Sequence, residues 1–371
     1  MEINKLHINK VHLNTVHLNC LKLLSKKKGG SIVPSLKPIA SYRAYDKTNN
    51  DTDRDILKDL TGNGHDIQLY NFEFAESSGY GKYGLSFSQY NNIKQDRAVI
   101  EFDGDYITII KSVVMGFWQL FNRISSQSII GEQRIKITNI PSGVTINYGY
   151  QNDDGEAQYL ISAANDGVYD IPSFTVSSGR IYGFEIKPII DECNITIEQL
   201  PLYPNALVSD GVDDYGLCEN FPIFTKEKGY TVCAIRKWLN IIEGYRTIAS
   251  KYEIDTKRGA FIFEQIHSLF KQTYNYGKVT DIKKYFDNES LFSCQNSVKY
   301  NNEIVLEKGD AEDSNILSIF TAMNNDYGSA ALYALEIYDR DLTDEEIATV
   351  KARMIAEYEE KTGNKYEEET V

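Results

Sequence analysis

The chain has 371 residues, of which 42% are hydrophobic and 25% are charged, and its formal net charge is −14. This composition supports a packed core and excludes a largely disordered chain. The acidic balance argues against nucleic-acid binding, because phosphate neutralisation needs a basic surface. The 26 tyrosines and 16 phenylalanines favour strands. The length fits two or three domains, or one large β domain with an insertion.

Residues 1–30 form a separate segment that begins with a short apolar-polar repeat and ends at Gly29-Gly30. Such a segment buries too little surface to offset a backbone entropy cost of about 1–2 kcal/mol per residue. We therefore expect it to dock by β-pairing onto a larger assembly. In an extended chain, the apolar side chains of each repeat unit share one face. The predicted docking residues are Leu6, Ile8, Val11, Leu13, Val16, Leu18 and Leu21.

Cysteine usage and the N-terminal composition indicate a protein that folds in a reducing compartment. The cysteines are five, their spacing is wide and no Cys-x-x-Cys occurs, which argues against a disulfide framework or a zinc site. The basic-then-apolar pattern of a signal peptide is missing. No stretch approaches the ~20 apolar residues that a membrane helix needs, so we expect no membrane insertion.

From Pro34 onward, short β-like runs alternate with turns built from Asp, Asn and Gly, a pattern typical of a sandwich or jelly roll. Residues 112–125 stay open between a short buried helix and a strand pair, because their apolar run is too short for its period to decide. The clearest predicted strands are 98–102, 106–110, 134–138, 144–148, 159–162, 183–187, 194–198 and 230–234.

One helix is predicted near the end of the chain, from Leu342 to about Lys361. Thr343 and Glu346 have the spacing of a capping box, in which each residue satisfies a backbone N–H of the first helical turn. Apolar residues at positions 347, 350, 354 and 358 then recur at helical spacing. We expect this apolar face to pack against the sheet that contains the preceding strand, residues 332–338.

Three stretches in order carry a family resemblance. They contain Asp-Leu-Thr-Gly-Asn-Gly at 59–64, Asp-Gly-Val-Asp-Asp-Tyr at 210–215 and Arg-Asp-Leu-Thr-Asp-Glu-Glu-Ile at 340–347. Together they resemble the laminin-G or concanavalin A-like jelly roll. Residues 52–72 are also similar to jelly-roll modules in virion proteins of phages that infect Bacteroides, including crAss-like phages. The resemblance implies a lectin-like fold and a fibre or decoration role.

About 110 residues, 91–200, lie between the first two of these stretches and carry strands of their own. We interpret them as an inserted β-sandwich, because insertions are tolerated at exposed loops whose ends lie close together. The predicted fold class is therefore all-β: a jelly-roll sandwich with an inserted β-sandwich, a short N-terminal β repeat and a C-terminal helix. The predicted parts are an attachment segment 1–30, jelly roll 34–90, insertion 91–200, jelly roll with helix 201–362 and acidic tail 363–371.

Known catalytic patterns are missing from the sequence. A glycosidase needs two carboxylates that flank the scissile bond, and the nearest pattern, residues 253–258, has Arg258 in place of the second glutamate. The sequence has no nucleophile elbow, phosphate loop, dinucleotide glycine triplet or zinc-protease motif. We predict that the protein is not an enzyme.

Two oxygen-rich loops have the residue types that calcium prefers. The alternative for both loops is turn chemistry with solvated charge, and the two interpretations stay open. No other cofactor is expected. The candidate calcium ligands are Asn49, Asp51 and Asp53 in one loop, and Asp210, Asp213 and Asp214 in the other.

A glycan site would show aromatic side chains beside Asp and Asn on one sheet face or rim. Most strand tyrosines are half-buried sheet residues, and the sequence does not say which of them share a face. The tyrosines that lie near glycines and asparagines are Tyr70, Tyr80, Tyr83, Tyr90 and Tyr327.

These observations predict a non-enzymatic structural protein of a phage virion, as a head fibre, decoration or tail appendage. Its N-terminal segment would attach it to capsid or tail proteins, and its lectin-like jelly roll would be displayed and touch host surface glycans. A homo-oligomer made in the host cytoplasm belongs to the same prediction. The alternative is a glycan-binding adhesin or receptor-binding protein, and a glycoside hydrolase is disfavoured.

Overall fold

The structure, a computed structural model, describes residues 36–75, 77–84, 92–93, 98–103, 106–112, 118–187, 194–239, 245–253, 255–267, 270–282, 291–322 and 327–366. The predicted attachment segment, with its seven docking residues, lies outside the described residues. Within the described part of the chain, no helix is long and apolar enough to cross a membrane.

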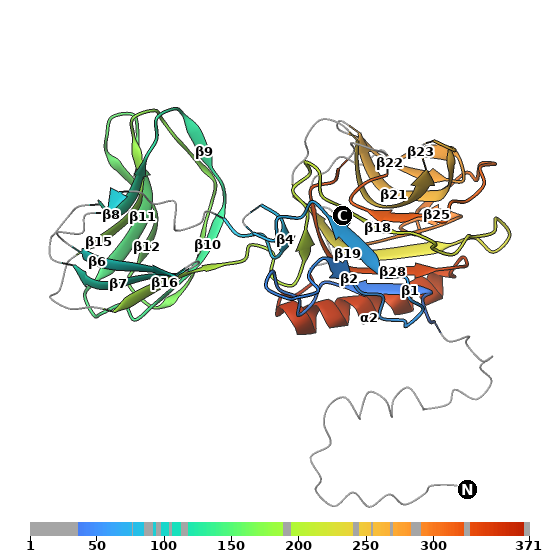
Figure 1. The fold of residues 1–371 in the computed structure, drawn as a ribbon, viewed down its shortest axis with the longest axis horizontal. Helices are drawn as coiled ribbons and strands as arrows, with labels where there is room; N and C mark the ends of the chain where they lie inside the picture. The colour runs from blue at the N-terminus through green and yellow to red at the C-terminus, as the bar shows by residue number, and fades with distance from the viewer. Residues whose placement is uncertain are drawn as a thin grey trace, which may run out of the picture. The chain divides into compact units, whose positions relative to one another are not determined.

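Two antiparallel sheets of eight strands each form the jelly roll (Figure 1). Sheet A has the order β26 (Ile304–Val305), β25 (Lys299–Tyr300), β24 (Phe292–Asn296), β19 (Thr231–Trp238), β28 (Ala330–Tyr338), β17 (Leu207–Val208) and β4 (Gly79–Tyr80), with β1 (Ala40–Arg43) also paired to β28. Sheet B has the order β2 (Ile56–Leu57), β3 (Ile67–Tyr70), β18 (Tyr215–Cys218), β27 (Leu317–Ile319), β20 (Tyr245–Glu253), β21 (Arg258–His267), β22 (Phe270–Asn275) and β23 (Lys278–Ile282).

One hydrophobic core joins the inward faces of sheets A and B. Leu69 of β3 and Phe263 of β21 lie in the same buried cluster as Val232 of β19 and Leu335 of β28. The strands that build it come from both sides of residues 92–200, and β17 pairs with β28 and β4 directly after those residues. The two flanking stretches therefore contribute to the same pair of sheets and the same core.

The C-terminal helix α2 spans Asp344–Thr362 and has the predicted capping box between Thr343 and Glu346. Its buried residues are the four predicted from the spacing: Ile347, Val350, Met354 and Tyr358. The ring of Tyr358 meets that of Tyr333 of β28 edge-on, with the centroids 5.0 Å apart. The helix therefore lies along sheet A (Figure 1), and the prediction of an all-β fold with one C-terminal helix is confirmed.

Residues between 92 and 200 form further antiparallel sheets with a separate core. Sheet C has the order β12 (Ala157–Ala163), β11 (Thr145–Gln151), β15 (Ile181–Lys187), β8 (Trp118–Arg123) and β5 (Asn92–Ile93). Sheet D has the order β13 (Gly167–Ile171), β10 (Gln133–Thr138), β16 (Ile195–Leu200), β7 (Tyr106–Ser112) and β6 (Ala98–Asp103). The strands β9 (Ser128–Ile130) and β14 (Phe174–Val176) form a small ribbon. The ambiguous residues 112–125 thus contain a strand, β8, at 118–123.

A buried ionic cluster joins sheet A to sheet B. Glu264 of β21 is fully buried and accepts two hydrogen bonds of 2.6 Å from Arg236 of β19. Lys271 of β22 lies 3.1 Å from the same carboxylate, and Tyr300 of β25 donates to it at 2.7 Å. Burial alone raises the pKa of Glu264, but the two cations outweigh it and hold that pKa well below its ordinary value. The carboxylate is therefore ionised at neutral pH.

We expect Glu264→Gln to lower the free energy of unfolding of the jelly roll by about 3–5 kcal/mol, because it removes the carboxylate that two buried cations share. The measurement is denaturant unfolding. The matched control is Glu312→Gln, which removes an exposed carboxylate 2.9 Å from Arg258 and should cost less than about 1 kcal/mol. Equal effects of the two substitutions would contradict this account of the cluster.

Candidate functional site

The pairing of β3 with β18 builds one outward face of sheet B. β3 alternates buried Ile67 and Leu69 with a more exposed Tyr70, because successive side chains of a strand point to opposite faces. The register sets Tyr70 directly opposite Tyr215, the first residue of β18. Two tyrosines from distant parts of the sequence therefore lie side by side on the face that points away from the core.

Three aromatic rings follow one another on this face, and we call Tyr70, Tyr215 and Tyr327 the tyrosine row. The rings of Tyr70 and Tyr215 are stacked, with centroids 5.0 Å apart and an interplanar angle of 17°. The ring of Tyr327 lies 6.1 Å from that of Tyr215. Tyr70 is 40% exposed, so the end of the row is open to solvent. Burial, and then the neighbouring tyrosines, raise the pKa of Tyr215, so its hydroxyl stays protonated.

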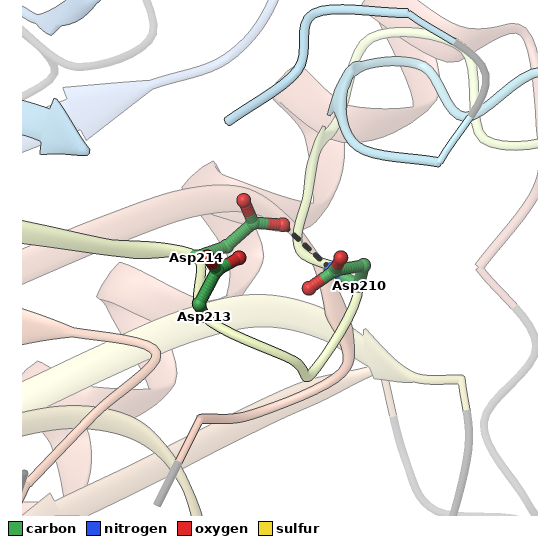
Figure 2. Close-up of side chains that lie close together, drawn as sticks. All are labelled: Asp210, Asp213 and Asp214. Atoms are coloured by element: carbon green, nitrogen blue, oxygen red, sulfur yellow. Dashed lines mark hydrogen bonds between the residues drawn. The ribbon is translucent and has the colours of Figure 1, made fainter. Parts of the chain in front are cut away.

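The loop before β18 carries the acidic side chains and is fixed by its own carboxylates; we call residues 210–214 the acidic loop. Asp214 accepts a hydrogen bond of 2.8 Å from the backbone N–H of Asp210 (Figure 2), and Asp210 accepts one of 2.7 Å from the N–H of Val212. Gly211 has φ of 83°, and a Cβ there would meet that of Ser329 at 2.8 Å. The turn therefore requires glycine at this position.

A hydrogen bond from a side-chain amide links the acidic loop to the residue that follows Tyr70. Asn71 follows Tyr70 in αL geometry, with φ of 66°, and its side-chain amide donates to the backbone carbonyl of Asp213 at 3.0 Å. The side chain of Asp213 is itself exposed. An exposed carboxylate thus lies in the loop that leads directly into the row.

Asp214 differs from its neighbours because its carboxyl group is fully buried. Burial raises the pKa of Asp214 to about 7, and the charge of Asp210 adds to the rise, whereas the N–H of Asp210 and the hydroxyl of Ser78 oppose it. The Ser78 hydroxyl lies 3.3 Å from the carboxyl oxygen. Asp214 is therefore a residue that holds the loop, and its carboxyl group does not face solvent.

The structure brings together three of the six calcium candidates. Ligand oxygens of Asp210, Asp213 and Asp214 all lie within 4.8 Å of one another, and these residues are the one such acidic set among the described residues. Their hydrogen bonds are those of a stable turn, which is the other interpretation that the sequence left open. Calcium binding here stays a prediction.

The other three candidates have protein partners of their own. Asn49 accepts from the backbone N–H of Tyr80 at 2.6 Å, and Asp51 accepts from the hydroxyl of Thr48 at 2.8 Å. Asp53 lies between two ammonium groups, 2.8 Å from Nζ of Lys47 and 2.5 Å from Nζ of Lys58. None of these partners belongs to the acidic loop.

Two of the tyrosines singled out from the sequence, Tyr70 and Tyr327, come together in the row. Tyr80 instead lies buried in the jelly-roll core, and Tyr90 lies outside the described residues. Tyr215 was missing from the sequence candidates, although its place directly after Asp213 and Asp214 at the start of a strand was a usable signal.

Neither a protein-family model nor a curated protein matches the chain. Among solved structures, the chain is similar to a truncated AlyQ with CBM32 and alginate lyase domains, at 10% identity and a TM-score of 0.24, over 74% of this chain and 99% of that one. It is also similar to Trypanosoma rangeli sialidase in complex with the inhibitor DANA, at 10% identity and a TM-score of 0.24, over 80% of this chain and 67% of that one.

A third similar structure is the N-terminal CBM22-1-CBM22-2 tandem domain of Xyn10C from Paenibacillus barcinonensis, at 10% identity and a TM-score of 0.17, over 71% of this chain and 99% of that one. TM-scores of this size carry no weight for fold or function. The jelly-roll assignment therefore stands on sheets A and B themselves.

The buried carboxyl of Asp214 makes stability depend on pH. Because its folded pKa of about 7 lies above the ordinary value of 3.8, its favourable contribution is complete below that ordinary value and is lost as the pH rises through 7. We expect Asp214→Asn to be more stable than the unaltered protein at pH 8, by a margin that shrinks toward pH 5. Each pKa unit corresponds to about 1.4 kcal/mol, so the full margin is a few kcal/mol.

The measurement is denaturant unfolding at several pH values in the presence of EDTA. Asp213→Asn controls for the loss of one negative charge from the same loop. A margin between Asp214→Asn and the unaltered protein that stays constant from pH 5 to pH 8 would show that Asp214 is not the titrating group.

Proposed function

We propose that the protein is a non-catalytic carbohydrate-binding protein whose ligand lies on the tyrosine row beside the acidic loop. The observation that carries this proposal is the stacking of the Tyr70 ring on the Tyr215 ring, with the Tyr327 ring next to it. The loop that leads into Tyr215 exposes the side chain of Asp213.

The chemistry of a sugar matches both halves of this surface. A pyranose ring has an apolar C–H face, which packs against exposed aromatic rings, and a rim of hydroxyl groups, which donate to carboxylate oxygens. Binding sites for small molecules combine aromatic walls with a few placed polar groups in the same way. The row supplies contact area with rigid side chains, and Asp213 supplies an acceptor at its edge.

The same geometry favours binding over hydrolysis. A glycosidase acid must reach the glycosidic oxygen with its proton. The one carboxyl group here with a pKa near neutrality belongs to Asp214, which is fully buried and bonded to the backbone of Asp210. It is held away from any ligand on the row, which supports the proposal that the protein is not an enzyme.

The finer hypothesis from the sequence concerns where this surface is displayed. A virion protein that is attached through residues 1–30, assembled as a homo-oligomer and exposed to host glycans would use the tyrosine row for that contact. The attachment residues lie outside the described residues, so the virion role stays a prediction. The adhesin and virion hypotheses share the same binding surface.

The test is binding to a glycan array, followed by calorimetry with the best ligand. We expect Tyr70→Ala and Tyr215→Ala each to weaken binding at least about tenfold, which is the loss typical of a central aromatic contact. The matched control is Tyr159→Ala on β12, since Tyr159 is exposed to the same 40% as Tyr70. This control should bind as the unaltered protein does.

Repeating the array with EDTA separates the two interpretations of the acidic loop. Loss of binding that calcium restores would assign a calcium ion to the loop, whereas unchanged binding would leave the row and Asp213 as sufficient. Absence of any glycan ligand, or full binding by Tyr70→Ala and Tyr215→Ala, would overturn the proposed function.

A further inference from the structure

A cleft of about 330 Å³ lies between the residues that follow β1 and β2 and the last turns of α2. Its lining has four cationic side chains, Arg43, Lys47, Lys58 and Lys361, against two carboxylates, Asp46 and Glu357. Two further carboxylates contact these cations from outside the lining: Asp53 lies on Lys47 and Lys58, and Glu336 lies on Arg43. Lys47 and Lys58 share the single carboxylate of Asp53, and two cations beside one carboxylate attract a second anion.

The ammonium groups of Lys47 and Lys58 have N–H donors that Asp53 does not use. Nζ of Lys47 and Nζ of Lys58 lie on the two oxygens of Asp53, at 2.8 and 2.5 Å. An ammonium group has three N–H donors. Among the described residues, Asp53 is the acidic partner of both lysines, and each lysine uses one of its oxygens. The Lys47 side chain is 18% exposed and that of Lys58 is 55% exposed. Asp53 therefore holds two ammonium groups close together while both remain within reach of a ligand.

Tyr45 adds a hydroxyl group with no partner. It lines the cleft, is 7% exposed, and its hydroxyl makes no hydrogen bond with the described residues. Burial, reinforced by the charge of Glu357, raises its pKa well above the ordinary value, so the hydroxyl keeps its proton. Buried polar atoms are nearly always satisfied, so a small shift of this side chain on ligand binding would give the buried hydroxyl an acceptor on the ligand.

The remaining lining residues supply acceptors and one apolar surface. Arg43 is 9% exposed and is fixed by Glu336 at 2.5 Å and Glu357 at 2.8 Å, so it positions Glu357 within the lining. Asp46 is ion-paired with Lys361. Leu60 is 62% exposed. The cleft thus combines ammonium donors, carboxylate acceptors, a hydroxyl donor and an aliphatic side chain.

We propose that this cleft binds an acidic sugar, a monosaccharide unit that carries a carboxylate group. Lys47 and Lys58 bind the sugar carboxylate, Asp46 and Glu357 accept from its hydroxyl groups, Tyr45 donates to an oxygen, and Leu60 packs against the ring. The volume lies at the lower end of the range for small-ligand sites, which suits one sugar unit. The cleft uses none of the residues of the tyrosine row, so the inference stands apart from the proposed function.

The experiment measures binding of glucuronate, glucose and inorganic phosphate to the full chain by calorimetry and by saturation-transfer NMR. We expect glucuronate to bind at least about tenfold more tightly than either other probe, because glucose lacks the carboxylate and phosphate lacks the ring. Phosphate binding as tight as that of glucuronate would reveal a general anion site and overturn the proposal. Equal binding of glucose, or no binding of glucuronate at millimolar concentration, would overturn it as well.

Variants then locate the bound sugar. Lys58→Met should weaken glucuronate binding about tenfold or more, since charge-assisted hydrogen bonds are the strong ones. The control is Lys278→Met, because that side chain is 53% exposed and lies 2.9 Å from Glu307, much as Lys58 lies beside Asp53. Equal weakening by the two variants would place the sugar elsewhere and overturn the proposal.

Tyr45→Phe separates binding from folding. Removing an orphaned hydroxyl should leave the thermal midpoint of the free protein unchanged or raised, while the affinity for glucuronate falls several-fold. A lowered midpoint with unchanged affinity would show that the hydroxyl serves the fold alone, and would overturn its assignment to the ligand.

Discussion

The antiparallel pairing of β3 with β18 is the constraint on which the candidate site depends. The chain between these strands passes through sheets C and D, yet the pairing returns it to the same edge of the core. Once the register is set, Tyr70 meets Tyr215, and Asn71 reaches the loop that carries Asp213. A slip of either strand by one residue would turn the tyrosine of that strand toward the core, so the register that buries Leu69 also builds the aromatic surface.

Buried polar groups fix the segments that carry this surface. The buried carboxyl group of Asp214 accepts a hydrogen bond from the backbone of Asp210 and so stabilises the acidic loop. Its burial raises its pKa to about 7. Glu264 links the two sheets through cations from both of them, where a hydrophobic contact would set no particular geometry. The buried carboxyl groups of Asp214 and Glu264 thus fix the backbone around them, while the exposed side chains of Asp213 and Tyr70 remain available to a ligand.

Local signals in the sequence predicted much of the fold. The strands and the C-terminal helix were predictable because a turn, an alternation or the pair Thr343 and Glu346 lies within a few residues of what it specifies. The tyrosine row was not, since nothing near Tyr215 says that β3 is its neighbour. Likewise, Asp53 was interpreted by residue type as a calcium ligand, and its two lysine partners became visible only with the tertiary structure.

The most direct test of the central claim is a crystal structure of the protein with an oligosaccharide bound. The account predicts a pyranose ring packed against Tyr70 and Tyr215, with at least one of its hydroxyl groups hydrogen-bonded to Asp213. A structure in which no bound sugar touches any of these three side chains would contradict it, and the stacked tyrosines would then be a feature of sheet packing alone.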